Sequence, residues 1–154
     1  MKPLRVLIIE DSEQDADLLL RELKKVGYDT VHKRVENADD TVAALDAGNW
    51  DIVLSDYVMP NFSGLNAITL TRQKNPDLPL IIISGQIGED TAVAAMKAGA
   101  QDYILKGNLK RLGPAIEREL QEATNRRERR RMQEELRIDL PPIVVPGLML
   151  GPET

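Results

Sequence analysis

The chain has 154 residues and a formal net charge of −5, and 42% of its residues are hydrophobic but only 3% aromatic, which suits one aliphatic-core domain with an appendage. It contains no cysteine, which excludes disulfides and thiolate metal sites. No apolar run approaches the roughly 20 residues that cross a bilayer. The run over 4–9 is too short for a signal peptide, so we expect a soluble cytoplasmic protein with no membrane partner.

Strand and helix signals alternate from residue 4 to the last predicted helix. Short β-branched and leucine-rich runs predict strands, and segments with apolar positions at helical spacing, begun by a capping residue, predict helices. The first predicted segments are a strand over 4–9, a helix that Ser12 caps and that ends near Val26, and an edge strand over 29–35. A helix opened by Asp39 or Asp40 and ended by Gly48 follows, then a strand over 51–55 and a loop over 59–64. The remaining segments are a helix that Ser63 caps and that ends near Lys74, a strand over 80–83, a helix over 91–98, a strand over 102–105 and a last helix from about Asn108. Five strands alternating with helices predict right-handed crossovers and a parallel sheet covered on both faces.

The last predicted helix changes character along its length. Its apolar positions, such as Leu112, Ile116 and Ala123, keep helical spacing, but the apolar face then vanishes. Acids are interspersed among the arginines over 126–131 and aromatics are absent, which favours a solvated helix over nucleic-acid contact. We therefore predict a domain over 1–123, an extended helix that projects over 124–137, and a Pro/Gly-rich tail or fragment of a following module over 138–154.

Polar side chains follow four of the predicted buried strands at the point where each strand ends. Glu10 and Asp11 follow the first run, and Asp56, Ser84 and Lys106 follow three later ones. Because ligands bind outside the carboxyl ends of parallel strands, we expect three carboxylates, one hydroxyl and one ammonium to converge. Carboxylate oxygens without histidine or cysteine favour Mg²⁺. The pattern therefore predicts a divalent cation beside a phosphoryl group.

Several of these residues carry a family resemblance. In the order Glu10-Asp11, Asp56, Met59-Pro60, Ser84, Tyr103 and Lys106, they resemble the receiver domain of bacterial two-component response regulators, the CheY-like family, over about residues 3–123. The resemblance implies a flavodoxin-like α/β fold whose five-stranded parallel sheet has the order 2-1-3-4-5. It also implies that Asp56 accepts a phosphoryl group from a histidine kinase or a phosphotransfer protein.

The resemblance assigns a role to each oxygen ligand of the metal. Asp11 and Asp56 would bind Mg²⁺ directly, and the backbone carbonyl of Val58 would supply a third ligand. Glu10 would act through water. These assignments make the cluster a magnesium site that also contains the phosphoacceptor.

Three further side chains would respond to the phosphoryl group. By resemblance, Lys106 places its ammonium on the phosphoryl oxygens and Ser84 donates its hydroxyl. The movement of Ser84 would let Tyr103 turn inward and change the surface of the fourth helix and fifth strand. That surface, with the last helix, is the expected output face and a candidate homodimer interface. We expect signalling with self-phosphorylation and self-dephosphorylation, not an enzyme acting on another substrate.

Two features depart from the commonest pattern of this family. Gly107 follows Lys106 where many members carry proline, so the usual cis X-Pro bond is unavailable. Val58 and Gln86 occupy the positions that tune how fast water attacks the acyl phosphate in the family. Because valine cannot orient a water molecule, we predict slow self-dephosphorylation.

Two other classes of protein share parts of this pattern. An aspartate-nucleophile phosphatase also uses a strand-end aspartate with Mg²⁺, but it should carry a second acid two residues later, where this chain has Val58. A flavodoxin-like flavin carrier needs a hydroxyl-rich phosphate loop after the first strand, whereas residues 11–15 are acidic. His32, the only histidine, is expected to be a solvated residue of the edge strand.

Overall fold

The structure, a computed structural model, describes residues 1–85 and 88–139. The chain divides into two compact units, Met1–Ala123 and Thr124–Thr154. Helix α5 (Leu112–Asp139) contributes residues to both units. From residue 140 onward, the predicted tail lies outside the described residues. Within the part of the chain that is described, no helix is long and apolar enough to cross a membrane.

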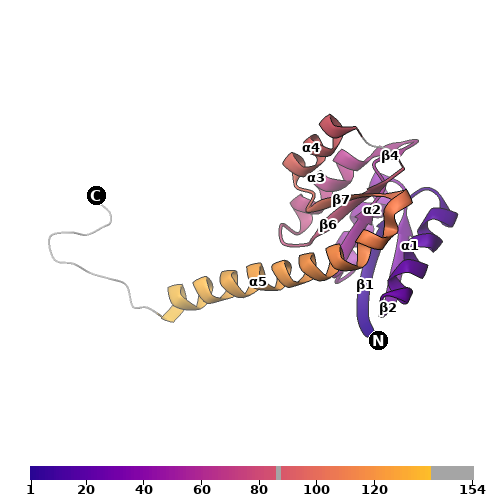
Figure 1. Cartoon of the computed structure of the whole chain (residues 1–154). Helices are drawn as coiled ribbons and strands as arrows, with labels where there is room; N and C mark the ends of the chain where they lie inside the picture. Colours follow the sequence, from indigo (N-terminus) through magenta and orange to yellow (C-terminus); the bar gives the residue numbers. More distant parts are fainter. Residues whose placement is uncertain (86–87, 140–154) are drawn as a thin grey trace, which may run out of the picture. The chain divides into compact units, whose positions relative to one another are not determined.

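A five-stranded parallel sheet forms the centre of the first unit (Figure 1). Its strands are β1 (Lys2–Ile9), β2 (Tyr28–Val35), β3 (Ile52–Ser55), β6 (Leu80–Ser84) and β7 (Asp102–Leu105). Their order is β2-β1-β3-β6-β7, which confirms the predicted order 2-1-3-4-5 because β6 and β7 are the fourth and fifth strands of this sheet. The edge position predicted for residues 29–35 is also confirmed, and His32 there is exposed.

Side-chain caps determine where most of the helices begin. The helices are α1 (Glu13–Lys25), α2 (Ala38–Ala47), α3 (Gly64–Lys74), α4 (Glu89–Ala98) and α5. As predicted, the hydroxyls of Ser12 and Ser63 accept hydrogen bonds from backbone amides at the starts of α1 and α3. The prediction that Asp39 or Asp40 opens α2 was wrong. Asn37 caps that helix by accepting a 2.7 Å hydrogen bond from the amide of Asp40, because asparagine caps as well as aspartate does.

The segment after β7 differs from the predicted helix. Lys106–Arg111 is a 3₁₀ helix, η1, with non-helical dihedral angles at Asn108, and α5 begins only at Leu112. Pro114 has no N–H to donate to a carbonyl four residues earlier, so it fits only the first turn of an α-helix. The predicted start at Asn108 was therefore about one turn too early. The predicted loop over 59–64 overlaps a short antiparallel pair, β4 (Val58–Met59) and β5 (Phe62–Ser63).

Apolar side chains on both faces of the sheet form two core clusters. Along β1, Val6 and Ile8 belong to the cluster beneath α1 and the first turns of α5, whereas Leu7 and Ile9 belong to the cluster beneath α2, α3 and α4. Each fully buried leucine or isoleucine contributes about 1.5–3 kcal/mol to folding. The expected two-sided cover is therefore present, and it leaves the polar ends of the strands as the open edge of the sheet.

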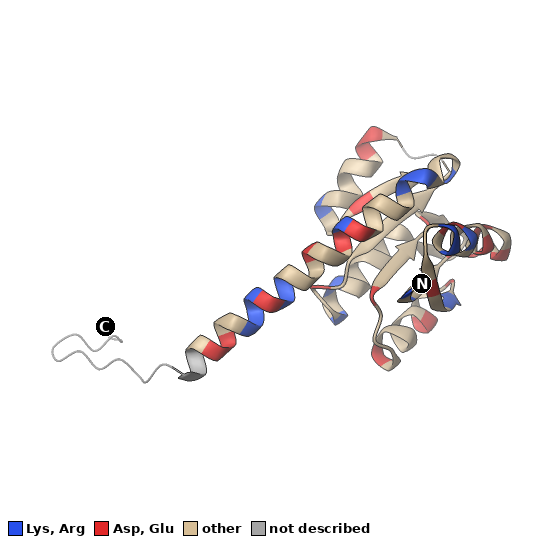
Figure 2. Ribbon diagram, turned by 60° about the horizontal axis from the view of Figure 1, so that its bottom comes forward, with Lys and Arg blue, Asp and Glu red and all other residues tan. Residues whose placement is uncertain are grey.

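Charged residues of both signs are interspersed along the described part of α5 beyond Ala123 (Figure 2). The side chains over 127–136 are exposed, and they include the apolar Met132 and Leu136. An apolar face of the kind that seats the first turns of α5 is absent from this described stretch.

Candidate functional site

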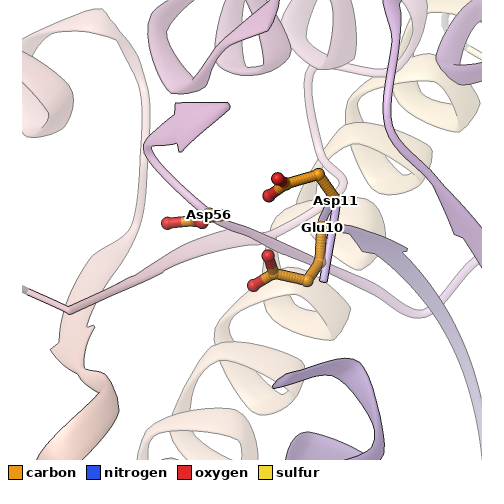
Figure 3. A group of neighbouring side chains, drawn as sticks. All are labelled: Glu10, Asp11 and Asp56. Atoms are coloured by element: carbon orange, nitrogen blue, oxygen red, sulfur yellow. The ribbon is translucent and has the colours of Figure 1, made fainter. Parts of the chain in front are cut away.

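Three carboxylates gather at the carboxyl ends of two neighbouring strands. One oxygen from each of Glu10, Asp11 and Asp56 lies within 4.8 Å of the others (Figure 3). The parallel register pairs Ile9 of β1 with Ser55 of β3, and the amide of Asp56 donates a 2.8 Å hydrogen bond to the carbonyl of Ile9. The residues that follow the paired positions therefore emerge side by side, as the strand-end pattern predicted.

The cluster has a buried base and an open side. Glu10 is 1% exposed and Asp56 is 8% exposed, whereas Asp11 is exposed. The amide of Ser12 donates a 3.1 Å hydrogen bond to Glu10, and the amide of Tyr57 donates a 2.7 Å bond to Asp56. Backbone donors thus orient the two buried carboxylates, while Asp11 remains accessible to an ion from solution.

The carboxylates destabilise one another's charges. Burial, assisted by the charge of Asp56, raises the pKa of Glu10 to about 7, although hydrogen bonds from Lys106 and the amide of Ser12 oppose the rise. A divalent cation among these oxygens would offset both the burial and the repulsion. The donor set contains only hard carboxylate oxygens, and it fits Mg²⁺ better than a metal that prefers sulfur or nitrogen ligands.

Lys106 brings a cation to the same place from the first residue of η1. Its Nζ lies 2.7 Å from Asp15 Oδ2, 3.0 Å from Glu10 Oε1 and 3.3 Å from Asp56 Oδ2. Burial alone would lower the pKa of Lys106, but hydrogen bonds to Asp15 and Glu10 and the charges of Glu10 and Asp56 raise it above its ordinary value. The ammonium therefore stays protonated at neutral pH. The Lys106–Gly107 peptide bond is trans, so this arrangement does not involve a cis bond.

Asp15 is a site residue that the strand-end pattern did not predict, because it lies within α1 and not directly after a strand. The hydroxyl of Ser12 accepts a hydrogen bond from its amide, which places Asp15 in the first turn of the helix. Side chains of a helix lean toward its N-terminus. An acid in this turn therefore leans back toward the ends of the strands, a signal that could have identified it.

The structure also describes Ser84, Val58 and Tyr103, three other residues to which the resemblance assigns a role. Ser84 is the buried last residue of β6, and it pairs in register with Leu105, the residue before Lys106. The side chain of Val58, two residues after Asp56, is 71% exposed. Tyr103 is half-buried on β7 and lines a groove of about 450 Å³ along α4. Gln86 lies outside the described residues.

The sequence matches one known family over most of its length. The sequence model of the response regulator receiver domain matches residues 6–117, which include Glu10, Asp56, Ser84 and Lys106. Response regulator MprA from Mycobacterium sp. strains KMS, JLS and MCS is 36% identical to this chain over 107 residues. The match covers 68% of this chain but only 44% of each relative, so the chain spans less than half the length of these curated relatives.

Solved structures share the fold. NtrX from Brucella abortus is 28% identical with a TM-score of 0.74, over 86% of this chain and 30% of that chain. TrrA from Thermotoga maritima, solved in complex with Mg²⁺-BeF, is 27% identical with a TM-score of 0.65, over 77% of this chain and 99% of that chain.

Proposed function

We propose that Asp56 accepts a phosphoryl group in two-component signalling, because this chain belongs to the response regulator receiver domain family. A receiver domain is a signalling domain, and its output is a change of conformation or association. The observation that supports Asp56 most directly is its setting. It is a buried carboxylate that lies both within a cluster of three acids and 3.3 Å from the ammonium of Lys106.

The proposed step transfers a phosphoryl group from a phosphohistidine. A carboxylate oxygen of Asp56 attacks phosphorus, and the P–N bond breaks as the P–O bond forms. The imidazole nitrogen leaves with the electron pair and takes up a proton. Mg²⁺, when bound, would neutralise charge on the transferring group. Asp11, Asp56 and the carbonyl of Val58 would hold it directly and Glu10 through water, since carboxylate and carbonyl oxygens are the ligands it prefers.

Lys106 and Ser84 are the proposed stabilisers of the product. The ammonium of Lys106 already contacts Asp56, so it can offset the charge of the phosphoryl oxygens with little movement. Ser84 ends the strand next to β3 and would donate its hydroxyl to the same group. Ser84 pairs in register with Leu105, and Tyr103 lies two residues before Leu105 on the same strand. A shift of Ser84 would therefore be followed by an inward turn of the Tyr103 side chain. Phosphorylation would then shift the balance between two surface arrangements.

The proposed partners are a histidine kinase or a phosphotransfer protein upstream and a module or second copy downstream. The groove beside Tyr103 includes the exposed apolar side chains of Val93 and Met96 on α4. A surface of this kind suits a contact whose shape depends on Tyr103. We propose that output, including any homodimer, uses α4, β7 and the first turns of α5.

Mass spectrometry after treatment with acetyl phosphate and Mg²⁺ tests this proposal. We expect the wild-type chain to gain one phosphoryl group, and we expect Asp56→Asn to abolish the gain. Asp29→Asn removes an exposed acid from the start of β2 and serves as the matched control, which should be phosphorylated normally. No gain in the wild-type chain, or a gain that persists in Asp56→Asn, would contradict the assignment.

A further inference from the structure

We infer that Asp15 restrains Lys106 before phosphorylation and competes with the phosphoryl group for its ammonium. The inference rests on the proposed function of Asp56, and it adds a positioning residue to the site. Asp15 would set how readily Lys106 changes partners, without touching the reacting atoms itself.

The three acids around Lys106 lie at different distances from its ammonium. An ammonium has three N–H donors, and here three carboxylates lie close enough to accept them. The contact with Asp15 is the shortest at 2.7 Å, and the contact with Asp56 is the longest at 3.3 Å. The ammonium is therefore held most closely by the acid that lies outside the metal cluster.

A bound metal would weaken some contacts of Lys106 more than others. Glu10 and Asp56 belong to the group of acids that could hold a metal ion, whereas Asp15 does not. A cation at that group would weaken the hold of Glu10 and Asp56 on Lys106 by sharing their charge. The contact with Asp15 would remain, so Asp15 is the partner that keeps Lys106 in place when the metal site is filled.

A phosphoryl group on Asp56 would compete with the acids that now contact Lys106. Its oxygens add negative charge beside Asp56, and the ammonium must direct donors to them at the expense of its present acceptors. The side chains of Lys106 and Asp15 are 26% and 36% exposed, so their ion pair is strong enough to bias the ammonium but weak enough to break. Removing the carboxylate of Asp15 should therefore favour the form in which Lys106 contacts the phosphoryl group.

Binding of beryllofluoride at saturating Mg²⁺, measured by titration calorimetry, tests the competition. We expect Asp15→Asn to bind beryllofluoride about two- to fivefold more tightly than the wild-type chain, which is the range that a partly exposed ion pair allows. Asp17→Asn makes the same charge change on the same helix, at an exposed residue that is not a described partner of Lys106. This control should bind like the wild-type chain. Equal affinities for the wild-type chain and Asp15→Asn would overturn the inference.

A double-mutant cycle without metal tests the restraint itself. Urea unfolding in EDTA is compared for the wild-type chain, Asp15→Asn, Lys106→Gln and the double variant. We expect a coupling of about two- to fivefold in the unfolding equilibrium constant. A cycle with no coupling, or beryllofluoride binding tightened as much by Asp17→Asn as by Asp15→Asn, would show that Asp15 acts only through its general charge and would overturn the inference.

These outcomes separate the inference from the proposed function. If the wild-type chain gains a phosphoryl group on Asp56 but Asp15→Asn behaves like Asp17→Asn, only the role of Asp15 fails. If the wild-type chain neither gains a phosphoryl group nor binds beryllofluoride, the proposed function is contradicted, and so is the competition between Asp15 and the phosphoryl group. The metal-free cycle would then still report whether Asp15 restrains Lys106.

Discussion

Nη2 of Arg118 donates a 2.8 Å hydrogen bond to Oδ2 of Asp102 and thereby joins α5 to the first residue of β7. Oδ2 also accepts a 3.3 Å bond from Arg111, and the amide of Tyr103 donates to Oδ1. The carboxylate of Asp102 therefore connects the strand that carries Tyr103 with both helical segments that follow it. The buried Asp102 and its exposed arginine partners form a structural tie beside the proposed output surface.

The first prediction concerns this tie. Replacement of Asp102 by alanine should lower the free energy of unfolding by about 1.5–3 kcal/mol, because hydrogen bonds to a charged group are lost. Arg118→Ala should also lower it, because Asp102 and the buried Glu119 each lose a hydrogen bond from this arginine. Urea denaturation provides the measurement. In the Asp102→Ala background the effect of Arg118→Ala should shrink, and full additivity of the two changes would show that the pair does not act together.

The second prediction is a pH dependence of stability at Glu119. Burial raises the pKa of Glu119 above its ordinary value of 4.5, although the hydrogen bond from Arg118 opposes the rise, and Oε1 has no partner among the described residues. The exposed Arg118 gains from the same contact, so its own pKa also rises. For Glu119, burial raises the pKa more than the hydrogen bond from Arg118 lowers it.

The folded chain holds the proton of Glu119 more tightly than the unfolded chain does, so stability falls as this proton is lost with rising pH. The contribution of Glu119 to stability is greatest below pH 4.5 and is lost as the pH rises through the raised folded pKa. Glu119→Gln should therefore become more stable relative to the wild-type chain as the pH rises from 4.5 toward neutrality. Urea unfolding at a series of pH values measures this difference, and a difference that is constant over that range would contradict the burial argument.

The third prediction concerns the metal. Mg²⁺ should raise the melting temperature of the wild-type chain, because a ligand that binds only the folded state stabilises it, by about 1.4 kcal/mol at ten times its Kd. Asp11→Asn removes the exposed carboxylate of the cluster and should abolish most of the shift. Sodium chloride at equal ionic strength is the control for screening. The same shift with either salt, or in both chains, would argue against a magnesium site at these acids.

The fourth prediction concerns the lifetime of the aspartyl phosphate. The exposed isopropyl group of Val58 offers no hydrogen bond to a water molecule near Asp56, so the phosphate should be lost slowly. Val58→Asn supplies an amide that can orient water, and it should shorten the lifetime of the aspartyl phosphate by about tenfold. This is less than the rate enhancement that a well-placed general acid or base gives. Mass spectrometry over time follows the loss. Equal lifetimes in the two chains would remove Val58 from the control of hydrolysis.

The fifth prediction concerns the output surface. Met96 is exposed on α4 and lines the groove beside Tyr103. If phosphorylation promotes a homodimer through this surface, Met96→Glu should weaken it by placing a charge in an apolar contact. Sedimentation with beryllofluoride measures the association, and phosphorylation of Asp56 should be unaffected. Asp46→Asn on the exposed face of α2 is the control. A dimer that tolerates Met96→Glu would exclude this face.

Much of the fold could be predicted because local signals coincide with the elements. The runs over 4–9 and 80–83 are too apolar to lie anywhere but in buried strands, and Ser12 and Ser63 are caps followed at once by helical spacing. The errors arose where two local signals compete. At the start of α2, Asn37 and the two following acids are all good caps. After β7, apolar positions at helical spacing suggested an α-helix from about Asn108, but the dihedral angles of Asn108 are non-helical.

The sequence by itself determined which polar residues end the strands, because strand length is set by apolar runs and every run of a parallel sheet ends at the same edge. Only the tertiary structure decided which acid faces which cation. Asp15 and Lys106 are 91 residues apart, and their contact depends on how α1 packs against β2 and η1. Burial, which raises the pKa of Glu10, is likewise a property of the packed neighbours. Local propensity acts over a few residues, whereas charge and burial act through space.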